Sequence, residues 1–161
     1  MYIDVTYPTE KTEFYKLLDQ QVKLYIGAET DRTAALSNFS AVLKIAFPRA
    51  NWAGFYLVRG DELVLGPFQG RPAVTRIPRG AGVCGTAWEE NRSRVVEDVD
   101  CFAGHIACDC GSHSEIVIPL RDAGGRIWGV LDMDSVDVGG FTEEDRIGLE
   151  GCVRCLGRFA G

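Results

Sequence analysis

The sequence predicts an α+β fold, in which a mainly antiparallel sheet is flanked by helices. Two stretches with helical spacing of apolar residues come first, a run of short apolar segments follows, and a further helical stretch closes the chain. Connections of hairpin length join the short segments, which favours antiparallel pairing, with the helices packed on one face of the sheet. Because 161 residues fit one domain, we expect a single domain over residues 1–161.

Three longer helices are predicted, over residues 10–26, 32–47 and 142–159. We expect Thr9 to be the N-cap of the first helix, because Glu10 directly after it favours the positive end of a helix. Asp31 is the expected N-cap of the second helix, which Pro48 ends. Thr142 is the expected N-cap of the last helix, since three acidic residues follow it.

Six apolar segments are predicted to be strands, over residues 51–58, 62–68, 71–78, 93–99, 114–120 and 126–135. The Arg-Gly-Asp sequence at 59–61 joins the first two as a hairpin turn. A short helix over 83–91 is expected after the glycine-rich turn at Gly80 and Gly82. Strands and one short helix therefore make up the middle of the chain, and the longer helices make up both ends.

The charge balance argues against two classes of partner. The chain carries 17 basic and 23 acidic residues, a net charge of −6, and its arginines are scattered. Nucleic acid and anionic membrane surfaces both require a basic footprint, so we expect neither as a partner. The N-terminal segment lacks the apolar core of a signal peptide, and no apolar run approaches the ~18 residues of a membrane span, which predicts a cytoplasmic protein.

Six cysteines are then expected to be reduced, as core residues, metal ligands or redox groups. Cys152 and Cys155 lie late in the last predicted helix, on its buried stripe, and we interpret both as inert core residues. Cys84 follows the glycine-rich turn near the start of the short helix, where the helix dipole favours a thiolate. A small buried residue is the alternative for Cys84.

Residues 101–113 concentrate three cysteines and both histidines in the order C-x3-H-x2-C-x-C-x2-H. These are zinc-ligand types, although the spacing is not that of a familiar zinc module. A reactive thiol in an ordered loop is the competing hypothesis, and a loop with incidental cysteines is the third. His105 is a candidate base or ligand, whereas His113 is as compatible with a solvated role.

The strand predicted over 126–135 places Trp128, Val130, Asp132 and Asp134 on one face. Two carboxylates side by side at the end of an apolar strand repel each other, so one of them tends to hold a proton near neutral pH. Such a pair can donate a proton or bind a cation. The alternative is that the strand ends earlier and both aspartates are solvated turn residues.

Aromatic residues mark the first predicted strand. Trp52 and Tyr56 share a face of this strand, with Gly54 between them. Core packing is the usual role of such residues. The functional alternative is an aromatic wall for a small apolar group, with room provided by Gly54.

Several segments together resemble a known family. In chain order they are NWAGFYL, LVLGPFQG, IPRGAGVCGTA, GHIACD, SEIVIPL and GVLDMDS. They resemble the free methionine-(R)-sulfoxide reductases, which are single GAF domains, over about residues 10–158. The resemblance implies a GAF-like fold with a closed small-ligand pocket, and reduction of free L-methionine (R)-S-oxide to L-methionine by thiols, without a cofactor or metal.

The resemblance also implies roles for individual residues. Cys108 in GHIACD matches the attacking cysteine, which becomes a sulfenic acid, and Cys84 in GVCG matches the cysteine that resolves it as a disulfide. Thioredoxin is the implied reductant. The substrate-binding positions implied by the family are Trp52, Tyr56, Glu115, Asp132 and Asp134. Val74 stands where many members carry a third cysteine, so a relay through that position is absent here.

Two alternatives of other classes stay open. One is a non-catalytic GAF sensor that binds a small ligand, which would not need Cys84 and Cys108. The other is a zinc-binding module built from residues 101–113. The sequence leaves open whether the protein forms a homodimer.

Overall fold

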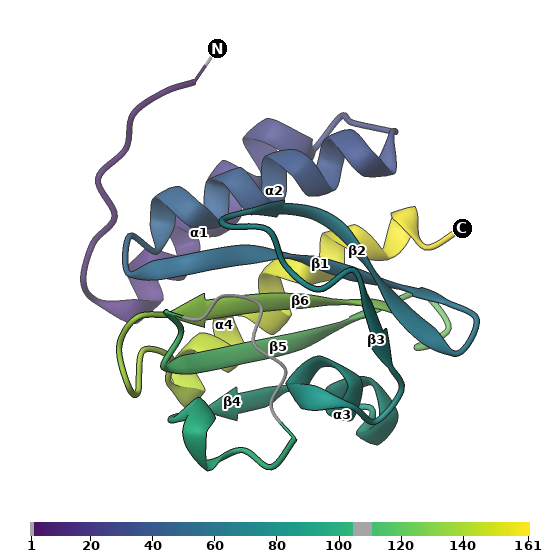
Figure 1. The fold of residues 1–161 in the computed structure, drawn as a ribbon. Helices are drawn as coiled ribbons and strands as arrows, with labels where there is room; N and C mark the ends of the chain where they lie inside the picture. The colour runs from purple at the N-terminus through teal and green to yellow at the C-terminus, as the bar shows by residue number, and fades with distance from the viewer. Residues whose placement is uncertain (1, 105–110) are drawn as a thin grey trace.

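A computed structural model describes residues 2–104 and 111–161, and these residues build one six-stranded sheet in the order β3-β2-β1-β6-β5-β4 (Figure 1). Every neighbouring pair of strands is antiparallel, as the short connections predict. The strands are β1 Ala50–Arg59, β2 Glu62–Gln69, β3 Arg76–Pro78, β4 Arg94–Val96, β5 Ser114–Arg121 and β6 Ile127–Ser135. The helices are α1 Lys11–Ile26, α2 Arg32–Ala46, α3 Gly82–Glu90 and α4 Glu143–Val153, with 3-10 turns η1 Val99–Cys101 and η2 Arg154–Phe159.

The two faces of the sheet carry separate hydrophobic cores. The larger core lies between the sheet and α1, α2, α4 and η2, and it includes Leu36 and Phe55. The smaller core lies on the opposite face, on the side of α3 (Figure 1). It includes Cys84 and Trp88 of α3 and Tyr56 of β1. The helices therefore cover both faces, and the expectation that they share one face is wrong. None of the helices in the described ranges combines the length and apolar character needed to cross a bilayer.

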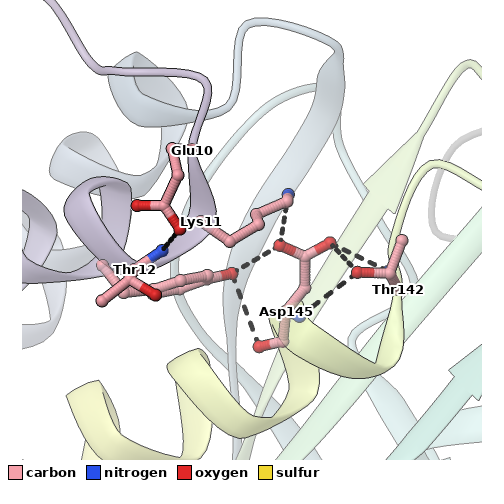
Figure 2. Close-up of polar contacts among 6 residues, drawn as sticks. Glu10, Lys11, Thr12, Thr142 and Asp145 are labelled. Carbon is pink, nitrogen blue, oxygen red and sulfur yellow. Dashed lines mark hydrogen bonds and ion pairs between the residues drawn. The ribbon is translucent and has the colours of Figure 1, made fainter.

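The N-terminus of α1 differs from the expectation. Glu10, and not Thr9, is the N-cap: its carboxylate accepts a hydrogen bond from the backbone N–H of Thr12 at 2.9 Å (Figure 2). It accepts a second from the backbone N–H of Glu13 at 2.8 Å. A carboxylate at this position also interacts favourably with the positive end of the helix dipole. Asp31 caps α2 as predicted, through a hydrogen bond that its side chain accepts from the Ala34 N–H.

Thr142 caps α4 as predicted, and its partner Asp145 connects α4 to α1. Asp145 is buried, and its Oδ2 accepts a hydrogen bond from the Thr142 N–H at 2.8 Å, which completes a capping box (Figure 2). Its Oδ1 accepts hydrogen bonds from Lys11 Nζ and Tyr15 Oη of α1, each at 2.7 Å. One carboxylate thus fixes the start of α4 against the start of α1.

Several predicted elements are shorter than the apolar segments suggest. Only Arg76–Pro78 of the segment 71–78 is a strand, and only Arg94–Val96 of 93–99. The last predicted helix is α-helical only to Val153, and η2 continues it as a 3-10 helix. At both edges of the sheet, the apolar segment in the sequence is therefore longer than the strand that forms regular hydrogen-bonded pairs.

Trp128 departs from the predicted alternation of β6. It packs in the larger core, whereas Val130 faces the smaller core, so these two residues do not share a face. The register of β5 and β6 shifts between Leu120 and Arg121, whose partners are Gly129 and Ile127. The extra residue on β6 is Trp128, and a β-bulge of this kind interrupts the period of two.

Candidate active site

Three buried carboxyl groups meet on the face of the sheet that α3 covers. Glu115 lies on β5 directly opposite Asp134 of β6, and Val117 lies opposite Asp132. The exposed fractions of Glu115, Asp132 and Asp134 are 2%, 0% and 0%. Both aspartates lie inside the strand Ile127–Ser135, so the alternative that they are solvated turn residues is excluded.

Glu115 has an altered protonation equilibrium. Burial raises the pKa of its carboxyl group well above the ordinary value, and the negative charge of Asp134 raises it further. A hydrogen bond with Asp132 acts in the opposite direction without cancelling the shift. Glu115 therefore keeps its proton over a wider pH range than an exposed glutamate, which suits a proton donor.

Cys84 adds a thiol to this carboxyl cluster. It lies in the first turn of α3 and is buried, and its Sγ donates a hydrogen bond to Glu115 Oε1 at 4.0 Å. Sγ and one carboxylate oxygen each of Glu115 and Asp132 all lie within 4.8 Å of one another. The predicted position of Cys84 near the helix start is confirmed, and its side chain faces the carboxyl groups.

The glycines beside Cys84 explain how α3 reaches this position. Gly82 adopts a φ of +61°, in the left-handed region that favours glycine. A Cβ at Gly85 would lie 2.6 Å from the Pro78 carbonyl oxygen, closer than side chains approach backbone. The pattern GVCG therefore lets the helix begin directly against the preceding strand.

Trp52 and Tyr56 are both buried and stack on each other, with ring centroids 5.9 Å apart and ring planes 22° apart. Trp52 Nε1 donates a hydrogen bond to the Arg71 carbonyl oxygen at 3.1 Å, and Tyr56 Oη donates one to the Val74 carbonyl oxygen at 2.9 Å. Both rings are thus anchored to the segment between β2 and β3. Since β1 pairs with β6, Trp52 lies opposite Asp134 and beside the carboxyl cluster.

Phe68 is a third aromatic residue at this site that sequence reasoning missed. Its ring stacks on Trp52 with centroids 5.1 Å apart. It also occupies the space beside Gly54, because a Cβ at Gly54 would lie 2.2 Å from Phe68 Cβ. The expectation that Gly54 leaves room for a ligand is therefore wrong: the room is filled by Phe68. Its position depends on the pairing of Gly54 with Phe68 across β1 and β2, which the local sequence pattern does not specify.

The segment 101–113 is only partly described. Cys101 and His113 are exposed. The candidate nucleophile Cys108, together with His105 and Cys110, lies outside the described residues.

The two C-terminal cysteines belong to the core of the helical layer, as predicted. Cys152 is buried in the larger core, and Cys155 packs against it. Burial raises the pKa of Cys152 to about 12, so its thiol stays protonated at neutral pH. Burial also raises the pKa of Cys155. Neither thiol has the character of a redox nucleophile.

Comparison with known proteins places this geometry in a family. Residues 28–154 match the model of the GAF domain. The free methionine-R-sulfoxide reductase of Escherichia coli is 52% identical over 146 residues, which cover 91% of this chain and 88% of that protein. The protein of the same name from Saccharomyces cerevisiae is 37% identical and covers 89% of this chain and 85% of its own length.

Solved structures agree in fold as well as sequence. The X-ray structure of free methionine-R-sulfoxide reductase from Neisseria meningitidis in complex with its substrate superposes with a TM-score of 0.93. That protein is 46% identical, and the match covers 99% of this chain and 96% of that one. The chain therefore belongs to the GAF domain family and, within it, to the free methionine-R-sulfoxide reductases.

Proposed function

We propose that this protein is a thiol-dependent reductase that converts free L-methionine (R)-S-oxide to L-methionine. Family membership supports this activity. The observation that carries it in this chain is the convergence of Cys84 with three buried carboxyl groups, beside the aromatic pair of Trp52 and Tyr56. A thiol, a proton source and an apolar wall are the groups that sulfoxide reduction requires.

In the proposed reaction, Cys108 attacks the sulfoxide sulfur while a protonated carboxyl group donates a proton to the sulfoxide oxygen. The oxygen passes to the Cys108 sulfur, so the substrate gains two electrons and leaves as methionine, and Cys108 becomes a sulfenic acid. Glu115 is the proposed proton donor, because burial and Asp134 raise its pKa. Protonation makes the sulfur more electrophilic at the moment of attack.

The second half of the cycle restores the thiols. Cys84 attacks the sulfenic sulfur of Cys108, water leaves, and an intramolecular disulfide forms. Thioredoxin then reduces this disulfide by two thiol–disulfide exchanges, which returns both cysteines to thiols. We place this cycle in the cytoplasm, with residues 1–161 acting as one domain.

The remaining negative charge is proposed to select the substrate. One carboxyl group donates its proton to the sulfoxide oxygen. The negative charge on Asp132 and Asp134 then pairs with the α-ammonium group of a free amino acid. Trp52 and Tyr56 are proposed to pack against the S-methyl group and so to favour the R epimer. Burial of the acidic groups strengthens this preference, because an unmatched buried charge costs more than an exposed one.

The test of the proposed function is reduction of the two separated epimers of free methionine sulfoxide, with thioredoxin, thioredoxin reductase and NADPH. We expect the R epimer to be consumed and the S epimer to remain. Binding of the R epimer without turnover would instead favour the non-catalytic sensor, and equal reduction of both epimers would contradict the proposed pocket.

A further inference from the structure

Cys84, Glu115 and Asp132 bring together one thiol and two carboxyl groups, which are the side-chain types that bind divalent metal ions. The three side chains come from α3, β5 and β6, three separate elements. Their sulfur and oxygen atoms lie within 4.8 Å of one another, and all three residues are buried. Three ligand atoms this close together could bind one metal ion, and they come from two neighbouring strands and the helix that covers them.

The ligand set matches a borderline-soft divalent cation. Zinc binds thiolate sulfur at about 2.3 Å and carboxylate oxygen at about 2.0–2.2 Å, so a tetrahedral site separates the two atoms by roughly 3.5 Å. Cys84 Sγ and Glu115 Oε1 are 4.0 Å apart. The distance between these two atoms would have to shorten by about half an ångström to fit a tetrahedral zinc site. Small rotations about the side-chain bonds are enough for this change. Magnesium and calcium prefer sites made of oxygen ligands alone, so the thiol of Cys84 favours zinc over both of them.

We propose that the reduced protein binds one Zn²⁺-like cation through Cys84, Glu115 and Asp132, with water in the fourth position. On binding, the Cys84 thiol and the Glu115 carboxyl each release a proton to the buffer, and the cation takes their place. The dication then offsets the negative charge of three buried ligands, with Asp134 adding a favourable potential across the strand pair. No oxidation or reduction accompanies this exchange.

If the proposed function is correct, the cation and the substrate would compete for the same site. The metal would hold the thiol that resolves the sulfenic acid and two of the carboxyl groups that bind substrate. It would therefore act as a competitive inhibitor of the reduced protein. A disulfide at Cys84 removes the thiolate ligand, so oxidation would release the cation.

The experiment uses Co²⁺ as a spectroscopic substitute for zinc, added without oxygen to the reduced full-length protein after removal of the reductant. Equilibrium dialysis gives the stoichiometry and affinity, and near-ultraviolet absorption reports a thiolate-to-cobalt charge-transfer band. We expect one Co²⁺ per chain with this band. Cys84→Ser should abolish the band, and the near-isosteric Glu115→Gln should weaken binding by about tenfold or more.

Matched controls test the placement of the site. Cys155→Ser and Cys101→Ser remove thiols elsewhere, one packed against the helical core and one exposed, and both should bind Co²⁺ as the wild type does. A band that survives in Cys84→Ser and is lost in Cys108→Ser would move the metal to residues 101–113 and overturn the proposal. So would wild-type protein that binds no cobalt. If Cys84→Ser fails to fold by circular dichroism, Glu115→Gln decides: unchanged affinity overturns the proposal.

Failure of this inference is distinguishable from failure of the proposed function, because cobalt binding is measured without substrate. If the protein binds cobalt at Cys84 and reduces no sulfoxide, the metal site is supported and the proposed enzyme activity is refuted. If it reduces the sulfoxide and binds no cobalt, the activity is supported and the metal site is refuted. Where both hold, Zn²⁺ should raise the KM for free methionine-R-sulfoxide and leave kcat unchanged.

Discussion

Glu115 illustrates how one residue can serve function at the expense of stability. Its carboxyl group is buried, and it faces Asp134 across the strand pair. Burial and that neighbouring charge raise its pKa well above the ordinary value, so the folded state keeps this proton over a pH range in which the unfolded chain has already released it. The folded protein therefore loses stability when this proton is removed.

We predict that Glu115→Gln removes this pH-dependent loss. Because the folded pKa is raised, the contribution of Glu115 is complete below the unfolded pKa and is lost as pH rises toward and through the folded pKa. The free energy of unfolding of the variant should therefore fall less than that of the wild type between acid and alkaline pH. Urea unfolding across this range measures the difference.

The matched control is Glu97→Gln, which neutralises an exposed glutamate. Its pH profile should follow that of the wild type. If Glu115→Gln and wild type show the same slope, the raised pKa of Glu115 is wrong. Sulfoxide reduction by Glu115→Gln should fall regardless, because the amide is not an acid.

The cysteines provide a second prediction at the scale of residues. Cys108→Ser should abolish sulfoxide reduction, because an alcohol is a far weaker nucleophile than a thiolate. Cys84→Ser should release about one methionine per chain and then stall, because attack and resolution are separate steps. A single-turnover assay with mass spectrometry of Cys108 measures both outcomes.

Cys152→Ser and Cys155→Ser are the controls, since both thiols belong to the helical core. Their turnover per folded molecule should equal that of the wild type. Undiminished steady-state turnover in Cys84→Ser would instead mean that another thiol resolves the sulfenic acid, with Cys110 the nearest to Cys108 in the sequence.

Individual site residues differ in how far the sequence predicts them. Residue type and alternation place Asp132 and Asp134 on one strand face, and the structure confirms their burial. Phe68 could not be found in this way, because its contact with Trp52 depends on the register between β1 and β2. That register shifts at an irregularity between Gly54 and Tyr56, which a local pattern does not reveal.

At the scale of elements, Asp145 determines how α4 docks. Burial alone would raise the pKa of Asp145, but hydrogen bonds from Lys11 and Tyr15 and the backbone N–H of Thr142 outweigh it and lower the pKa. The ionised carboxylate is therefore the form that the folded state prefers. The Asp145 carboxylate therefore both caps α4 and holds α4 against α1.

We predict that Asp145→Asn lowers the free energy of unfolding by about 1–3 kcal/mol at neutral pH, because it removes the charge that accepts hydrogen bonds from Lys11, Tyr15 and Thr142. The folded pKa is lowered, so the wild-type contribution is present above the unfolded pKa and is lost as pH falls through the folded pKa. The difference between variant and wild type should therefore shrink in acid. Urea unfolding at both pH values measures it.

Lys11→Met is the matched control, since it removes only the partly exposed ion-pair partner. It should cost less than Asp145→Asn, because Tyr15 and Thr142 still donate hydrogen bonds to the Asp145 carboxylate in this variant. An equal cost for the two variants would contradict the role of Asp145 as a cap.

Elements were easier to predict than their ends. Apolar spacing predicted the three longer helices α1, α2 and α4, because burial of one face imposes the period. The short helix α3 was predicted from the glycine-rich turn before it, and η1 was not predicted. The ends depend on single hydrogen bonds, such as the Glu10 carboxylate that replaces Thr9 as the cap. They also depend on tertiary pairing, as at β3 and β4, and the sequence does not specify such pairing locally.

For the whole molecule, the separation of the two cores has a consequence for specificity. The carboxyl groups lie with the smaller core, shielded from water, so charge there must be matched by the ligand. We predict that free methionine-R-sulfoxide is reduced at least ~100-fold better, in kcat/KM, than its N-acetylated, C-amidated form, equivalent to about 2.7 kcal/mol. The cause is the loss of the α-ammonium group.

Singly modified substrates separate charge from size. The C-amide keeps the ammonium group and should retain more of the activity, whereas the N-acetyl compound should lose most of it. Comparable kcat/KM for free and doubly capped substrates would refute recognition of the ammonium group, even if the cysteine predictions hold.

The sheet ends on each side in a strand of only three residues, β3 and β4. Pro78 within β3 lacks a backbone N–H, and Arg94 brings a charge to β4. Short, interrupted edges of this kind are poor templates for a foreign strand and protect against edge-to-edge aggregation. Longer pairing surfaces, β1 and β6, are enclosed at the centre of the sheet. A foreign strand added beside β3 or β4 would therefore find only three residues of regular strand to pair with.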